Sequence, residues 1–235
     1  MNIKFTWTWP ALLFLRRLLR RLGINPYLMQ LLYGNDYEEA YDLELESLIQ
    51  PGDVIWDVGA NIGYYSRKFL QQTGPDGCVV AFEPSDRNFN ELTSSIGCSS
   101  NFIAFNVGLG AENETTFFNQ GLDPIGATSR ISKDPTEDSV KVSIFTGDTM
   151  CSLHNLSYPN VLKIDVEGSE LEVLKGIPIV LSSPSLYAIG VEVHFSILDQ
   201  DGRSNVARLI LEVLKNNSFI CKFVDPSHLI ATRNR

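Results

Sequence analysis

The chain alternates between short apolar runs and amphipathic segments from about residue 36 to residue 232. Apolar runs bounded by turn residues are typical of strands buried in a parallel sheet, and they occur at 54–58, 78–82, 102–107, 161–166, 186–193, 219–224 and 228–232. Segments with apolar residues at helical spacing occur at 36–49, 64–72, 86–95, 169–175 and 205–215. Strands that alternate with helices predict a right-handed, doubly wound (Rossmann-like) α/β fold around a mostly parallel, seven-stranded sheet.

Two connections depart from this alternation. Asp225-Pro226-Ser227 joins the last two predicted strands and is too short for a crossover helix, so these strands are expected to form an antiparallel hairpin at the edge of the sheet. The segment 108–160 is too long for an ordinary connection and contains two strand-like runs, 115–118 and 140–145. We interpret it as an insertion that is either a lid for acceptor recognition or a disordered surface excursion.

The chain divides into an N-terminal helical extension, residues 1–50, and one α/β domain, residues 51–235. Within the extension, 11–22 form a predicted amphipathic helix with leucines on one side and four arginines on the other. The charges follow the apolar run, unlike those of a signal peptide, and the run is too short to span a bilayer. This helix is expected either to dock on protein or to lie on an anionic membrane surface through residues 5–22.

Charge and cysteine content narrow the class of function. The chain has 19 basic and 28 acidic residues, a net charge of −9, and 44% hydrophobic residues, as in a globular protein. Its basic extension contrasts with an acidic body, which disfavours nucleic acid as a partner because phosphates would be repelled. The four cysteines have no metal-ligand spacing, so we expect a reducing, cytoplasmic environment.

The first two predicted strands each end in an acid, and a glycine turn follows the first. The turn reads Asp57-Val58-Gly59-Ala60-Asn61-Ile62-Gly63, and Glu83 ends the second strand. This arrangement predicts a nucleoside-binding crevice at the carboxyl edge of the sheet. The turn lacks the GxGxxG pattern of dinucleotide binders, which argues against a nicotinamide-dependent oxidoreductase. It resembles motif I of class I S-adenosylmethionine (SAM) methyltransferases, whose cationic cofactor suits an acidic site.

Two later strands carry charges where core residues are expected. Lys163, Asp165 and Glu167 share one face of their strand, while Glu192 and His194 share a face of the next. Buried charges are unfavourable unless they pair or face a cleft. If the two strands are adjacent, these acids and His194 meet at the carboxyl edge beside the cofactor crevice. A structural network in which Lys163 pairs with an acid is the other interpretation.

Several motifs together resemble the FkbM family of SAM-dependent methyltransferases. They are the turn 57–63, Phe82-Glu83-Pro84, the block 162–170 (LKIDVEGSE), Glu192-Val193-His194 and Asp225-Pro226-Ser227-His228. The resemblance runs from about residue 43 to residue 231, and KIDVEG is its most specific part. It implies a class I methyltransferase fold and O-methylation of a hydroxyl on a sugar, glycolipid or polyketide, without choosing among these acceptors.

We assign expected roles on this basis. His194 is the first candidate for general base, because an ordinary imidazole titrates near neutrality, and Glu192 or Asp165 would orient it or accept the proton directly. His194 is also compatible with a purely structural role. Asp148 is a further candidate for the acid cluster. The cluster permits a divalent metal, but no motif demands one, and none is expected.

For the cofactor, Asp57 is assigned to the methionine-end ammonium through the turn that contains Gly59, Asn61 and Gly63. Glu83 is assigned to the ribose hydroxyls, and Asn106 is expected near the adenine. The alternative function is a non-catalytic SAM-fold binding module, possibly at a membrane surface. Neither interpretation predicts an oligomeric state.

Overall fold

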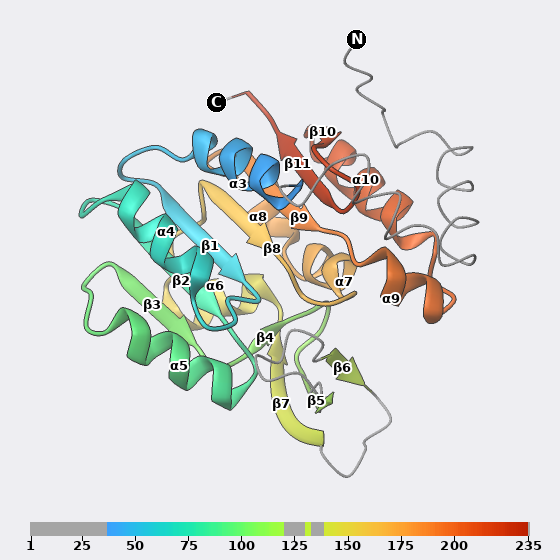
Figure 1. The fold of residues 1–235 in the computed structure, drawn as a ribbon, viewed down its shortest axis with the longest axis horizontal. Coiled ribbons are helices and arrows are strands. Elements are labelled where there is room, and N and C mark those ends of the chain that lie inside the picture. The colour runs from blue at the N-terminus through green and yellow to red at the C-terminus, as the bar shows by residue number, and fades with distance from the viewer. Residues whose placement is uncertain (1–36, 120–129, 133–138, 235) are drawn as a thin grey trace.

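The computed structural model describes residues 37–119, 130–132 and 139–234 (Figure 1). Its centre is a seven-stranded sheet in the order β10-β11-β9-β8-β1-β2-β3. The strands are β1 (Val54–Val58), β2 (Cys78–Phe82), β3 (Phe102–Phe105), β8 (Val161–Ile164), β9 (Ala188–Glu192), β10 (Ile220–Phe223) and β11 (His228–Thr232). These strands confirm the predicted α/β fold, with bounds that differ from the predicted ones by a few residues at most.

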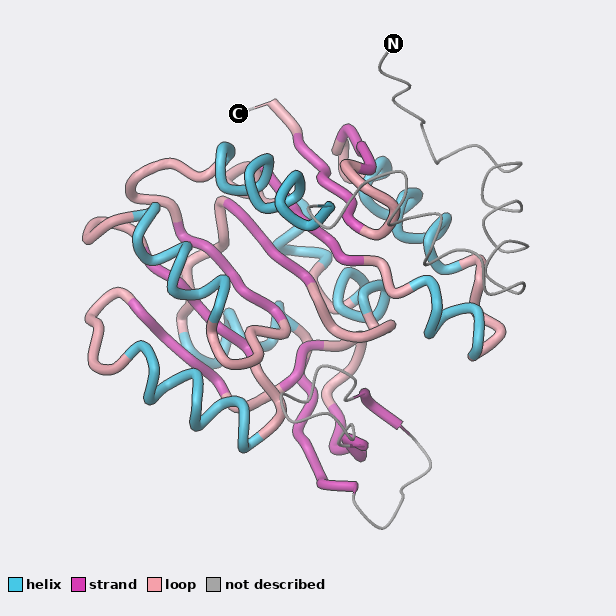
Figure 2. Tube along the Cα trace, viewed as in Figure 1, coloured by secondary structure: helices cyan, strands magenta, loops and turns pink. Residues whose placement is uncertain are grey.

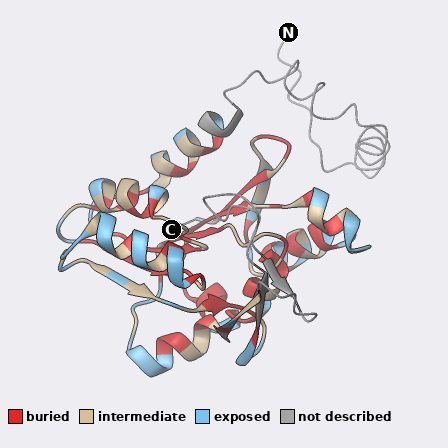
Figure 3. Cartoon of the chain, turned by 60° about the horizontal axis from the view of Figure 1, so that its bottom comes forward, coloured by how far each residue is buried: buried red, intermediate tan, exposed pale blue. Residues whose placement is uncertain are grey.

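Helices cover both faces of this sheet. They are α3 (Tyr37–Leu48), α4 (Tyr64–Thr73), α5 (Asp86–Ile96), α6 (Gly147–His154), α7 (Glu170–Lys175), α8 (Pro178–Ser182), α9 (Phe195–Gln200) and α10 (Val206–Asn216). On β1, Ile55 packs with residues of α3 and α4, whereas Trp56 packs in the larger core that includes α7, α8 and α10. Neighbouring strand residues thus point into opposite layers, so the central strands are buried on both sides (Figure 3).

The C-terminal hairpin is antiparallel, as predicted, and its second strand lies inside the sheet. β11 pairs antiparallel with both β10 and β9. In this register His228 lies opposite Glu192. The hairpin turn therefore reaches the carboxyl edge of β9, where the predicted acid cluster begins.

The insertion forms a small second sheet in the order β4-β7-β5-β6. Its strands are β4 (Gly108–Leu109), β5 (Glu114–Asn119), β6 (Arg130–Ser132) and β7 (Ser139–Phe145). The two strand-like runs are confirmed as parts of β5 and β7, which pair antiparallel. The described part of the insertion is therefore folded. Figure 2 shows it on the side of the main sheet where the central parallel strands end. A lid function for this sheet stays a prediction.

The expected helix at 11–22 and its proposed docking or membrane contact lie outside the described residues. The acidic helix expected at 36–49 corresponds to α3. Among the helices in the described ranges, none combines the length and apolar character needed to cross a membrane.

Candidate active site

The turn after β1 depends on glycine at two close contacts. Gly59 has φ +79°, and a Cβ placed on it would lie 1.8 Å from the backbone oxygen of Asp165. Gly63 has φ +89°, and its Cβ would lie 2.6 Å from a methyl carbon of Leu92 on α5. Asn61, between them, also has a positive φ of 50°. The turn therefore packs directly on the end of β8 and on α5.

Glu83 is buried under this turn. One of its oxygens accepts a hydrogen bond from the backbone N–H of Asn61 and the other from that of Ser85, each at 2.9 Å. Burial raises the pKa of Glu83 to about 7, although the two N–H donors oppose the shift. The Asn106 amide donates to the Glu83 carbonyl at 3.1 Å. The structure thus brings together three of the predicted cofactor residues, Asn61, Glu83 and Asn106.

Asp57 and Lys163 form a buried pair behind the turn. One oxygen of Asp57 accepts a hydrogen bond from Ser66 at 2.7 Å, and the other lies 3.4 Å from the Lys163 ammonium. Lys163 is also 3.3 Å from Asp165 and lies over the ring of Tyr65. Burial opposes the lysine's charge, but the carboxylates of Asp165 and Asp57 outweigh it and raise the pKa of Lys163. Lys163 thus pairs with acids, as the alternative interpretation of the charged strands proposed. The assignment of Asp57 to the cofactor stays a prediction.

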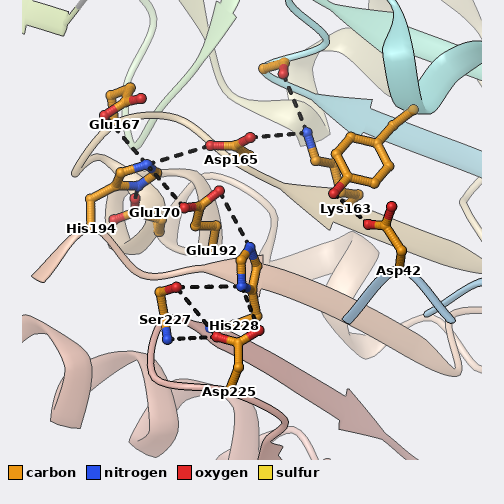
Figure 4. Close-up of polar contacts among 12 residues, drawn as sticks. Asp42, Lys163, Asp165, Glu167, Glu170, Glu192, His194, Asp225, Ser227 and His228 are labelled. Carbon is orange, nitrogen blue, oxygen red and sulfur yellow. Dashed lines mark hydrogen bonds and ion pairs between the residues drawn. The ribbon is translucent and has the colours of Figure 1, made fainter. Parts of the chain in front are cut away.

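His194 lies two residues after the end of β9 and is surrounded by carboxylates (Figure 4). Its Nε2 lies 3.3 Å from Glu167, 3.6 Å from Asp165 and 3.8 Å from Glu192, and its Nδ1 lies 2.6 Å from Glu170. The predicted convergence at the carboxyl edge is confirmed, because β8 and β9 are neighbours in the sheet. Asp165 links this group to Lys163 through its second oxygen. We call Asp165, Glu167, Glu170, Glu192 and His194 the carboxylate–imidazole cluster.

The cluster changes the charge expected for His194. Burial lowers the pKa of the imidazole, but hydrogen bonds to Glu167 and Glu170 outweigh it and raise the pKa to about 11. The ring is therefore an imidazolium at neutral pH in this environment. The choice of His194 as general base assumed an imidazole pKa near neutrality, and the raised pKa does not agree with that assumption.

Three residues of the site, Glu170, Asp225 and His228, were not assigned a role from the sequence. Glu170 is fully buried in the first turn of α7 and also accepts a hydrogen bond from the Gly168 N–H at 2.9 Å. His228 lies 2.7 Å from Asp225 and 3.5 Å from Glu192, and stacks on the ring of Tyr41. Burial lowers the pKa of His228, but Asp225 and Glu192 outweigh it and raise the pKa to about 9. The only sequence signal for the three was their place inside motifs shared with the family.

Asp148 does not join the cluster. Its two carboxylate oxygens accept hydrogen bonds from the backbone N–H groups of Ile179 and Val180, at 2.9 and 3.1 Å. N–H groups in the first turn of a helix have no acceptor within the helix. Asp148, on α6, supplies acceptors for two such groups of α8. The expectation that it belongs with the acids of β8 and β9 was wrong, because both of its carboxylate oxygens are bound to the start of α8.

Part of the cluster has the spacing of a metal site. In the described ranges, one ligand atom each from Asp165, Glu167 and His194 lie within 4.8 Å of one another.

The family model of the methyltransferase FkbM domain matches residues 57–223. The chain belongs to the FkbM methyltransferase family. The matched region contains the glycine turn, Glu83 and the whole carboxylate–imidazole cluster. Membership confirms the resemblance seen in the motifs.

Two relatives and one solved structure extend this comparison. The chain is 33% identical over 168 residues to a hexuronic acid methyltransferase of Haloferax volcanii, covering 70% of this chain and 66% of that one. It is 27% identical over 145 residues to Methyltransferase 1 of Beauveria bassiana, covering 52% and 57%. The chain thus spans less than two thirds of the length of each relative. A methyltransferase FkbM structure from Methylobacillus flagellatus has the same fold, with a TM-score of 0.51 and 15% identity over 80% of this chain and 49% of that one.

Proposed function

We propose that this FkbM-family protein transfers a methyl group from SAM to a hydroxyl of a small, sugar-like acceptor. The observation that carries the proposal is the backbone contact of Gly59 with Asp165, which sets the glycine turn beside the carboxylate–imidazole cluster. Ligands of open α/β sheets bind at this carboxyl edge. Family membership supports methyl transfer as the reaction.

The turn suits the ribose and the charged end of the cofactor. Each oxygen of Glu83 accepts one backbone N–H, from Asn61 in the turn and from Ser85, which leaves capacity for two ribose hydroxyls. Asn106 fixes the backbone of Glu83 and is proposed to lie near the adenine. Because Asp57 is already paired with Lys163, we propose that it acts on the methionine-end ammonium indirectly, by supporting the turn.

The chemistry places two demands on the chain. Bound SAM supplies a methyl carbon activated by the adjacent sulfonium, so the protein has to align the acceptor oxygen and remove its proton. Alignment contributes up to about 7–11 kcal/mol in favourable cases, and a general base adds a factor of about 10²–10⁴. Because His194 holds a proton, we propose that a carboxylate oxygen of Asp165 or Glu192 accepts the acceptor's proton, with His194 as its cationic partner.

The acceptor class rests on charge and on the relatives. The net charge of −9 disfavours nucleic acid. The haloarchaeal relative is named for a hexuronic acid, which favours a sugar over a polyketide or another part of a glycolipid. The small β4-β7-β5-β6 sheet follows β3 in the chain, and we propose that it contacts this acceptor.

Calorimetric titration with S-adenosylhomocysteine (SAH) tests the cofactor assignment. We expect one saturable site, which Glu83→Ala weakens at least tenfold, or about 1.4 kcal/mol. Glu91→Ala, which removes an exposed acid of α5, is the matched control and should bind as the wild type does. Equal affinities in the two variants would contradict the role of Glu83.

A transfer assay tests the reaction. Labelled SAM is incubated with the protein and a panel of free sugars, hexuronic acids and glycolipids, and label should appear on a hydroxyl of a sugar-type acceptor. SAH binding without transfer to any member of a broad panel would favour the non-catalytic binding module instead. Both relatives are named as methyltransferases, which argues against that alternative.

A further inference from the structure

The two nitrogens of His194 have different surroundings. Nδ1 donates to Glu170, which is fully buried and is itself held by the Gly168 N–H. Nε2 faces three carboxylates from the other side of the ring (Figure 4). A carboxylate that fixes one ring nitrogen is the usual outer partner of a histidine that binds a metal through the other. The orientation of His194 is therefore compatible with Nε2 as a metal ligand.

The distances on the Nε2 side match those between ligands of one ion. Nε2 lies 3.3 Å from an oxygen of Glu167 and 3.6 Å from an oxygen of Asp165. Adjacent ligands of an octahedral ion bound at about 2.1 Å are roughly 3 Å apart. Small side-chain movements would bring all three atoms into coordination. Glu192, at 3.8 Å, lies just outside this set.

Charge also favours a cation here. Four carboxylates lie within 4 Å of a single imidazole, and Lys163 and His228 contact two of these carboxylates. Even when His194 and His228 are both protonated, four carboxylates face three cations. Excess buried negative charge is unfavourable, and a divalent cation on the Nε2 side of His194 would relieve it.

We propose that Asp165, Glu167 and His194 form a divalent-cation site that binds the acceptor. Binding of the ion would displace the Nε2 proton of His194, so that the ring ligates as a neutral imidazole. Two carboxylate oxygens and this imidazole suit Mn²⁺ or Mg²⁺, and they leave coordination positions for water or substrate oxygens. The role of the ion rests on the proposed function. It would bind the reacting hydroxyl together with a neighbouring oxygen of the sugar and make that hydroxyl more acidic. It would also let a carboxylate-bearing sugar approach an acidic cluster that otherwise repels it.

Mn²⁺ alone is the probe for the site. The full chain is freed of metal with a chelator and titrated calorimetrically with Mn²⁺, in the absence of SAM and acceptor. We expect one saturable site per chain, and Glu167→Gln should weaken it at least tenfold. Glu172→Gln is the matched control, because Glu172 lies in α7 and pairs with Arg203 outside the cluster. Absent or non-saturable binding, or equal weakening by the two substitutions, would overturn the proposal.

A spectroscopic signature identifies the histidine. Pulsed electron paramagnetic resonance of the Mn²⁺-loaded protein should show coupling to an imidazole nitrogen, and His194→Gln should abolish it. Retained nitrogen coupling in this variant would overturn the ligand set. Thermal unfolding reports whether each variant is folded. If Glu167→Gln or His194→Gln does not fold, Asp165→Asn replaces it and should also weaken Mn²⁺ binding.

SAH titration of the same proteins separates this proposal from the proposed function. Mn²⁺ binding without SAH binding would sink the cofactor assignment and leave the metal site standing. SAH binding without Mn²⁺ binding would overturn the metal site and leave the cofactor assignment standing.

Discussion

The backbone of Gly59 lies against the carbonyl of Asp165, so close that a Cβ on the glycine would be 1.8 Å from that oxygen. This contact joins the turn that follows β1 to the first acid after β8. Asp165 in turn contacts both Lys163 and His194 through its two carboxylate oxygens. The proposed cofactor site and the proposed acceptor site therefore share one rigid junction, and a change at the junction should affect both.

Substitution of Gly59 tests this junction. We expect Gly59→Ala to displace the turn from β8, to reduce SAH affinity more than tenfold and to lower the free energy of unfolding by about 2–4 kcal/mol. Gly74→Ala is the matched control, because Gly74 also has a positive φ, +70°, but nothing lies within 4 Å of its Cβ position. In that control the free energy of unfolding should fall only by the strain of a left-handed alanine, about 1–2 kcal/mol, and the SAH affinity should stay unchanged. Urea unfolding and calorimetry measure both quantities; similar losses in the two variants would refute the junction.

The buried carboxyl of Glu83 predicts a pH dependence. Its pKa is raised from 4.5 to about 7 in the folded protein, chiefly by burial. A raised folded-state pKa contributes stability that is fully present below the unfolded value and is lost as pH rises through the folded value. Without ligand, the wild type should therefore lose stability relative to Glu83→Gln between about pH 4.5 and pH 7. Urea unfolding of both proteins across this range measures the difference, and parallel pH profiles would rule out the effect.

SAH affinity should change with pH in the opposite sense. Ribose hydroxyls donate to the ionised carboxylate, so binding favours the charged form of Glu83 and should release a proton below about pH 7. Calorimetry in two buffers of different ionisation enthalpy measures that release. We expect weaker binding as pH falls from 8 to 6 in the wild type and a flatter profile in Glu83→Gln.

Removal of the Lys163 ammonium should destabilise the fold strongly. Lys163→Met leaves the fully buried carboxylate of Asp57 without its cationic partner, which typically costs about 3–5 kcal/mol. The double variant Lys163→Met/Asp57→Asn should recover part of this loss, since the uncompensated charge is then gone. Lys175→Met, on the exposed side of α7, is the control and should change the unfolding free energy little. A double variant no more stable than the single one would argue against the pair.

Asp148 should matter for stability alone. Asp148→Ala removes two acceptors from the first turn of α8, and loss of such a cap typically costs about 0.5–2 kcal/mol. SAH and Mn²⁺ affinities should stay at wild-type values, because this carboxylate lies outside the carboxylate–imidazole cluster. A loss of Mn²⁺ affinity would return Asp148 to the site.

The sequence determined the strands and their order of appearance. Val54–Val58, Cys78–Phe82 and His228–Thr232 match their predicted bounds, because each is a short apolar run between turn or polar residues. The helices Gly147–His154, Pro178–Ser182 and Phe195–Gln200 were not predicted, since five to eight residues are too few to establish a helical period. Nor does a pattern along the chain reveal that β11 lies between β9 and β10, because that order depends on pairing between distant segments.

Some residues of the candidate site could be grouped from the sequence, and others could be placed only from the tertiary structure. Asp165, Glu192 and His194 could be grouped from the sequence, because neighbouring parallel strands end at the same edge of the sheet. Glu170 and His228 could not, because helix packing and the hairpin register bring them to that edge. The charge of His194 likewise depends on distances of 2.6–3.8 Å to four acids and on burial from water. The sequence thus supplied the chemical groups, and only the tertiary structure decided their separations, on which Coulomb energy and proton affinity depend.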